Sequence, residues 1–118
     1  MNEVQRFNRT INEKPAQVGC TDGAVNHEDL EMALECLSAW CEVNQIPPHT
    51  GEHCIVGDSM MYMCSYGDYN PCSADEIVTA WGAIQRDCGT NRGGWWHFHD
   101  WKKTYGVDVS GADVCSNM

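Results

Sequence analysis

Apolar side chains recur at helical spacing in two separate segments of the chain, and each segment begins with a helix-capping signal. The first segment follows Asn26, a favourable N-cap residue, and Glu28 and Asp29 place negative charge in its first turn. Its apolar stripe advances in steps of three and four residues and consists of Leu30, Ala33, Leu34, Leu37 and Cys41. We therefore predict a helix over residues 27–44 that ends before the proline pair at 47–48.

The second segment carries a fuller helix signature between Ser73 and Gly89. Ser73 and Glu76 match the S-x-x-E capping box, Asp75 and Glu76 place acidic charge in the first turn, and a glycine after the last apolar position is a typical stop. The apolar stripe consists of Ile77, Ala80, Trp81, Ile84 and Cys88. We predict a second amphipathic helix, and we assign to the core the two helical tryptophans, Trp40 and Trp81.

Between these helices, two short runs rich in β-forming residues predict a hairpin. The runs cover residues 53–57 and 60–64, with a turn at 57–59. A first strand near residues 17–25 and a last strand within 95–115 complete a β-α-β-β-α-β order. Because helices on one face of an antiparallel sheet are the expected layering, the predicted fold class is α+β, a single α/β sandwich.

Eight cysteines spread along the chain predict that covalent bonds stabilise this fold. Their number is even and none forms a C-x2-C pair, which favours a disulfide framework over a zinc or iron–sulfur cluster and over buried thiols. Cys36 and Cys41 lie about 140° apart around the helix, so each should bond a different partner, and we expect Cys41 and Cys88 to reach sheet or loop cysteines. The predicted disulfide residues are Cys20, Cys36, Cys41, Cys54, Cys64, Cys72, Cys88 and Cys115. Such a framework indicates a secreted, extracellular protein.

Residues 1–16 differ in composition from the rest of the chain. They contain no cysteine and few apolar groups, and Asn8 begins a glycosylation sequon whose use the sequence leaves open. We predict a flexible N-terminal arm at 1–16 and one disulfide-rich α/β domain at 17–118. The arm lacks the apolar centre of a signal peptide, so we expect a mature form whose leader has been removed.

The charge of the chain restricts its partners. Seventeen acidic and seven basic side chains give a formal charge of −10, which repels phosphate backbones and anionic membranes. The sequence has no run of 18 apolar residues, the length that a spanning helix needs. We therefore predict no nucleic-acid partner and no membrane span.

Residues 49–53 read H-x-x-E-H, the zinc signature of one class of metalloprotease. That chemistry needs a helix that places both histidines on one face. The prolines before the motif and Gly51 within it favour a loop, so we do not assign a zinc site here. Likewise, the chain has no G-x-S-x-G elbow, and oxidised cysteines are not nucleophiles. We predict no catalytic residue, no metal and no cofactor.

Residues 93–103 concentrate three of the five tryptophans and two histidines. A strand here would place His97 and His99 on one face and Trp96, Phe98 and Asp100 on the other. One face is then expected to seal the core; the alternatives are an exposed ligand-contacting patch and a metal site. The candidate binding residues of such a patch are Trp95, Trp96, His97, His99 and Trp101. We interpret a second aromatic stretch, residues 60–69, mainly as core.

Several of these features form one pattern over residues 17–118. It comprises an early cysteine, a helix with two cysteines, Cys64 followed by Ser65-Tyr66-Gly67, Cys88-Gly89 at the end of a capped helix, Gly94-Trp95, Tyr105-Gly106-Val107-Asp108 and Cys115. This pattern resembles the small cysteine-rich secreted effectors of plant-associated fungi that are related to killer toxins and to necrosis-inducing factors. The resemblance implies a secreted α/β sandwich without catalytic activity, and it transfers no functional residue.

The leading expectation is therefore a non-enzymatic effector or killer-toxin-like protein that binds a protein or cell-surface target of a host or competitor. A second effector protein is a further partner suggested by the resemblance. One alternative is a secreted inhibitor or an antimicrobial that binds wall polysaccharide, because tryptophan rings suit sugar faces. A second alternative is a small metal-dependent hydrolase that uses His97, His99 and Asp100.

Overall fold

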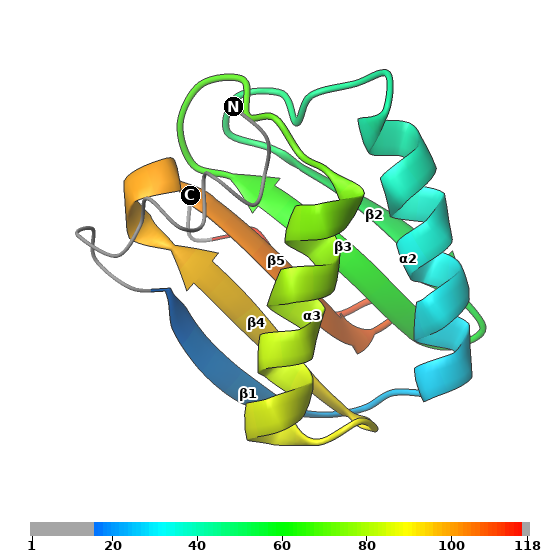
Figure 1. The fold of residues 1–118 in the computed structure, drawn as a ribbon. Coiled ribbons are helices and arrows are strands. Elements are labelled where there is room, and N and C mark those ends of the chain that lie inside the picture. Colours follow the sequence, from blue (N-terminus) through cyan, green and yellow to red (C-terminus); the bar gives the residue numbers. More distant parts are fainter. Residues whose placement is uncertain (1–15, 117–118) are drawn as a thin grey trace.

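The computed structural model describes residues 16–116 as two layers, a five-stranded antiparallel sheet with two helices on one of its faces (Figure 1). This confirms the predicted α+β fold, with one difference. The single strand expected within 95–115 is a pair of strands joined by a short 3-10 helix, η2. The elements are β1 (Gln17–Ala24), α2 (His27–Cys41), β2 (Gly51–Val56), β3 (Ser59–Ser65), α3 (Ala74–Cys88), β4 (Arg92–Phe98), η2 (His99–Trp101) and β5 (Lys103–Val109). Except for Ala16, the predicted N-terminal arm, with its Asn8 sequon, lies outside the described residues.

Both helices begin at the predicted caps. The Asn26 side chain accepts a hydrogen bond from the Asp29 amide, and the Ser73 side chain accepts one from the Glu76 amide. Helix α2 ends at Cys41, three residues earlier than predicted, since the amides of Glu42 and Val43 bond to carbonyls only three residues back and tighten the last turn.

The strand order β1-β4-β5-β3-β2 places β5 in the middle of the sheet. Strand β5 pairs with β4 on one side and with β3 on the other, although β3 lies about forty residues earlier in the chain. All seven residues of β3 are buried, in contrast to the alternating exposure of the edge strand β2.

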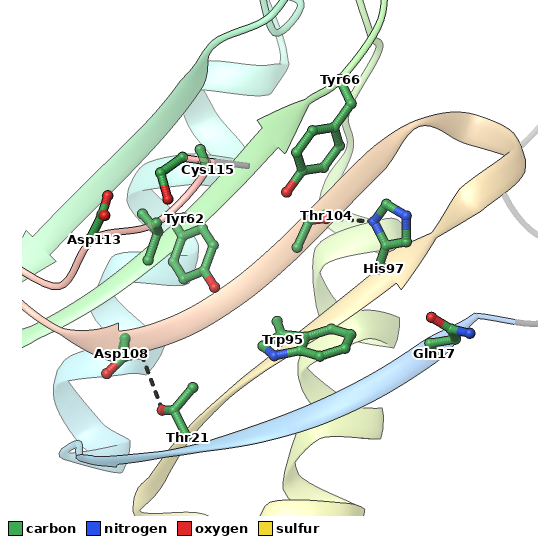
Figure 2. A pocket seen from close by; sticks show the side chains of 12 residues that line it. Gln17, Thr21, Tyr62, Tyr66, Trp95, His97, Thr104, Asp108, Asp113 and Cys115 are labelled. Atoms are coloured by element: carbon green, nitrogen blue, oxygen red, sulfur yellow. Dashed lines mark hydrogen bonds between the residues drawn. The ribbon is translucent and has the colours of Figure 1, made fainter. Parts of the chain in front are cut away.

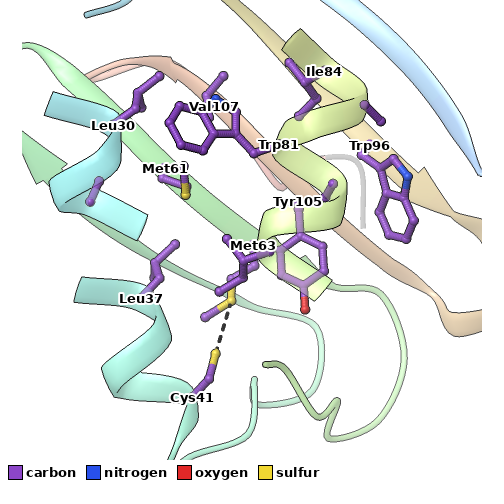
Figure 3. Close-up of a cluster of buried hydrophobic side chains, with 14 of the residues drawn as sticks. Leu30, Leu37, Cys41, Met61, Met63, Trp81, Ile84, Trp96, Tyr105 and Val107 are labelled. Carbon is purple, nitrogen blue, oxygen red and sulfur yellow. Dashed lines mark hydrogen bonds between the residues drawn. The ribbon is translucent and has the colours of Figure 1, made fainter. Parts of the chain in front are cut away.

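The main core lies between the helices and the sheet (Figure 3). Trp81 is buried there as predicted and stacks on His27, with ring centroids 5.0 Å apart, while Trp40 is partly buried against the same core. The residues that fill its centre include Leu30, Leu37, Met61, Met63, Ile77, Ile84, Trp96, Tyr105 and Val107.

A buried ion pair crosses this core at the start of α3. Lys103 and Glu76 have no exposed side-chain area, and Lys103 Nζ lies 2.6 Å from Glu76 Oε1. Lys103 also donates to the Pro71 carbonyl at 2.5 Å, and the Tyr105 hydroxyl donates to Glu76 Oε1 at 2.8 Å. Glu76 thus serves α3 in two ways: its amide completes the cap with Ser73, but its carboxylate points into the core rather than into the solvated first turn expected from the sequence.

All eight cysteines are paired, which confirms the predicted disulfide framework. Cys36 and Cys41 bond different partners, and Cys41 and Cys88 reach a loop cysteine and a strand cysteine. Three bridges fasten the helix layer: Cys20–Cys88 ties α3 to β1, Cys36–Cys54 ties α2 to β2, and Cys41–Cys72 ties α2 to the loop before α3. The fourth, Cys64–Cys115, fixes the C-terminal segment to β3.

Four disulfides are typical of a protein from an oxidising compartment. Within residues 16–116, neither helix has the length and apolar character needed to cross a membrane.

Candidate functional site

The sheet face opposite the helices carries the candidate site. One cross-strand row on this face runs Gly19, Trp95, Gly106, Tyr62 and His53 through the five strands in order. In this row an aromatic ring lies over each glycine. A Cβ atom on Gly19 would stand 2.1 Å from the Trp95 ring, and one on Gly106 would stand 2.2 Å from the Tyr62 ring. The two glycines therefore let the rings lie directly on the backbone.

Residues 110–116 cross this face as a covering segment. The Cys64–Cys115 disulfide holds the segment against β3. Ala112 and Val114 pack with it onto a small second core formed by Met60, Tyr62 and Cys64. Among residues 16–116, the segment thereby covers the β3 side of the face, and the β1 and β4 side is left open.

A groove of about 420 Å³ lies beside this segment (Figure 2). Its floor holds the aromatic rings of Tyr62 and Trp95, and Tyr66 stands at one end. Strand β1 contributes one side and the covering segment contributes the other. The lining residues are Gln17, Thr21, Tyr62, Tyr66, Trp95, His97, Thr104, Asp108, Asp113, Val114, Cys115 and Ser116.

Two hydrogen-bonded polar pairs flank the aromatic row, one on each side. His97 Nδ1 lies 2.7 Å from Thr104 Oγ1, and the Thr21 hydroxyl donates to Asp108 Oδ2 at 3.1 Å. Asp108 Oδ1 also accepts from the Val109 amide at 2.8 Å. These bonds fix the orientation of side chains that border the groove, so the polar groups are in place before any ligand arrives.

The electrostatics of the groove are those of a partly buried acidic site. Burial, followed by the negative charge of Asp108, raises the pKa of Tyr62 far above its ordinary value, so its hydroxyl stays protonated. Burial, followed by the neighbouring His99, lowers the pKa of His97, so its imidazole is neutral at pH 7. Asp108 and Asp113 contribute carboxylates, and the described lining contains no lysine or arginine.

The structure separates the five binding residues predicted from the sequence. Trp95 and His97 line the groove. Trp96 is only 5% exposed and packs in the main core, on the opposite face of the sheet, so it cannot belong to an exposed patch. Trp101 also turns toward that core and stacks on Phe98 at 4.2 Å.

His99 occupies a position that strand alternation alone would not give. Alternation holds from Trp95 to Phe98, but β4 ends there, and His99 and Asp100 belong to η2. The His99 ring lies 6.3 Å from the His97 ring, beyond the residues that line the groove. The segment predicted as one patch thus divides between groove, core and turn.

The H-x-x-E-H segment lies on the other side of the covering segment. His49 has a positive φ of 51° in the turn before β2, and Glu52 and His53 lie in the strand itself. The motif is therefore not on the helix that a zinc protease needs. His49, Glu52 and His53 border a second depression of about 290 Å³. No group of three metal-binding side chains occurs among residues 16–116.

Several groove residues were not identified from the sequence as one site. Tyr62 and Tyr66 belong to a stretch interpreted mainly as core, and Thr21, Thr104 and Asp108 carried no signal of their own. The available signal was Gly19 and Gly106 within predicted strand regions, because a strand glycine often marks the close approach of another group.

Comparison of the chain with protein-family models, with curated proteins and with solved structures gives no match.

Proposed function

We propose that this chain is a secreted, non-enzymatic effector or killer-toxin-like protein, and that it binds a target of a host or competitor cell through the groove on its open sheet face. The disulfide framework supports the secreted part of the proposal, because four bridges suit a small protein that works outside the cell. The groove supports the binding part.

The single observation that carries the proposal is the glycine-supported aromatic floor. The Trp95 ring lies on Gly19 and the Tyr62 ring lies on Gly106, each a glycine of the strand next to its own, so both rings are fixed against the backbone. The polar pairs beside them are already hydrogen-bonded. Tyr62 is buried beneath the covering segment, and Trp95 presents its ring to the groove. A rigid surface of this kind, with fixed polar groups beside it, loses little conformational entropy on binding, which is the property that a recognition site needs.

The test measures binding of fluorescently labelled, fully oxidised protein to plant protoplasts and to fungal cells. The variant Tyr66→Ala/Asp113→Arg changes the size and charge of the groove. Tyr69→Ala/Asp87→Arg makes the same two changes at exposed positions outside it, since Tyr69 is 63% exposed and neither residue lines the groove.

We expect saturable binding of the original protein and of the control variant to one cell type, and at least tenfold weaker binding of the groove variant. Equal losses in both variants would contradict a role for the groove. Release of a defined hydrolysis product by the original protein, abolished in the groove variant, would replace binding by catalysis.

A further inference from the structure

The groove combines an aromatic stripe with polar groups on both sides, and this combination has a specific chemical meaning. Successive residues of a strand rise about 3.3 Å, so rows two residues apart are separated by about 7 Å. One polar row contains Gln17, His97 and Thr104, the other contains Thr21 and Asp108, and the Trp95 and Tyr62 rings lie between them. Tyr62 is buried under the covering segment, so a ligand lies on the half-buried Trp95 ring and meets hydrogen-bonding groups along two opposite edges.

The flanking groups can still bond to a ligand. A carboxylate has about four lone-pair sites, and the Asp108 oxygens each use one, toward Thr21 and toward the Val109 amide. His97 contacts Thr104 through Nδ1, which leaves Nε2 as a second polar atom of the ring. Gln17 is exposed and offers both donors and an acceptor. The groove thus presents both hydrogen-bond donors and hydrogen-bond acceptors to a ligand.

Charge narrows the class of ligand. Two carboxylates border the groove and its described lining has no cationic side chain, while the whole chain carries a formal charge of −10. Phosphorylated, sulfated and uronic-acid ligands would be repelled. A ligand with apolar faces, a rim of hydroxyl groups and no negative charge is a neutral sugar.

We infer that the groove beside residues 110–116 binds a short segment of a neutral oligosaccharide, with a sugar face stacked on the half-buried Trp95, a further contact to Tyr66 at the end of the groove, and hydroxyl groups bonded to the flanking polar rows. This inference rests on the proposed binding function and names its ligand. The volume of about 420 Å³ falls in the lower part of the range for small-molecule sites, which suits a few sugar rings better than a protein surface.

The test is a titration of the full-length, oxidised, ¹⁵N-labelled protein followed by NMR. The probes are the tetramers of β-1,4-linked N-acetylglucosamine and of β-1,4-linked glucose, with trigalacturonate as the anionic comparison. The indole N–H signal of Trp95, assigned with Trp95→Phe, reports on the groove, and the indole signals of Trp40 and Trp81 serve as internal controls outside it.

We expect one neutral tetramer to shift the Trp95 signal with a Kd of about 0.1–1 mM, and trigalacturonate to leave it unchanged. Tyr66→Ala should weaken binding roughly three- to tenfold through loss of one aromatic contact, and Tyr69→Ala should leave the Kd unchanged. Trp95→Phe should also weaken binding, which keeps the test decisive if the alanine variant folds poorly.

Absence of a shift with both neutral tetramers would overturn the inference, as would a stronger response to trigalacturonate or equal affinities of the Tyr66 and Tyr69 variants. The proposed function has a separate readout. If the groove variant loses cell binding but neither neutral tetramer binds, the sugar inference fails while the binding function stands.

Discussion

Replacement of Lys103 by methionine should destabilise the protein by about 3–5 kcal/mol, the cost of breaking a buried ion pair from one side. Lys103 and Glu76 have no exposed side-chain area, so water cannot replace the lost partner. The substitution keeps an unbranched side chain of similar length, which limits the loss of packing. It removes the ammonium group that lies 2.6 Å from Glu76 Oε1 and 2.5 Å from the Pro71 carbonyl oxygen. The buried carboxylate keeps its bond from Tyr105 but loses the ammonium group of Lys103.

The assay is guanidinium unfolding of the oxidised protein at pH 7, followed by tryptophan fluorescence. With a slope of about 3 kcal/mol per molar guanidinium, a loss of 3 kcal/mol lowers the unfolding midpoint by about 1 M. Lys102→Met is the matched control, because the neighbouring Lys102 is exposed. Its free energy of unfolding should change by no more than about 0.5 kcal/mol.

The double variant Glu76→Gln/Lys103→Met tests the cause of the loss. Removing both charges should recover at least about 1 kcal/mol relative to Lys103→Met, since a glutamine oxygen can still accept the Tyr105 hydroxyl without leaving a buried charge. An unfolding midpoint of Lys103→Met equal to that of the original protein would refute this account. So would a double variant less stable than the single one.

Three further predictions concern the open face. Gly106→Ala should lower the free energy of unfolding by about 1–3 kcal/mol in a denaturant titration, because the new methyl group would overlap the phenol ring that lies on this glycine. Gly82→Ala, with open space around it, should raise that free energy by about 0.5–1 kcal/mol, and equal effects of the two substitutions would contradict the close approach. Removing the Cys64–Cys115 bridge by a double alanine substitution should lower the free energy of unfolding by about 2–4 kcal/mol in the same assay and should weaken ligand binding in the groove. An unchanged ligand affinity would show that the bridge does not shape the site. Burial and a neighbouring histidine lower the pKa of His97 below its unfolded value of about 6.5, so protonation favours the unfolded chain. The contribution of His97 to the free energy of unfolding should therefore be constant above pH 7 and fall as the pH drops through 6.5. NMR titration of the imidazole should show the lowered pKa, and an ordinary value would contradict the burial.

Much of the fold could be predicted from the sequence because its signals are local. Asn26 and Ser73 mark the helix starts through bonds within a single turn, and the apolar stripes identify the buried faces. The disulfide state followed from the number and spacing of the cysteines. The pairing did not, because it depends on which strands become neighbours.

The site was less predictable because it depends on contacts between distant segments. Trp95 and His97 were identified by composition, and the structure places Trp96, grouped with them as a binding candidate, on the opposite face of the alternating strand. Asp108 and Thr21 are 87 residues apart in the chain and come into contact only when β5 lies near β1. Lys103 likewise has no local signal for burial, since its partner Glu76 lies on α3.

The central position of β5 has a consequence for how the molecule is produced. Until Lys103–Val109 has emerged from the ribosome and been inserted, β4 and β3 have no common partner, and the apolar strand β3 presents an unpaired edge. Most contacts of the sheet therefore form late and across long stretches of chain, the topology that folds slowly. We expect nascent chains shortened before residue 103 to aggregate or be retained by chaperones, because the sheet cannot close until β5 has followed α3 and β4.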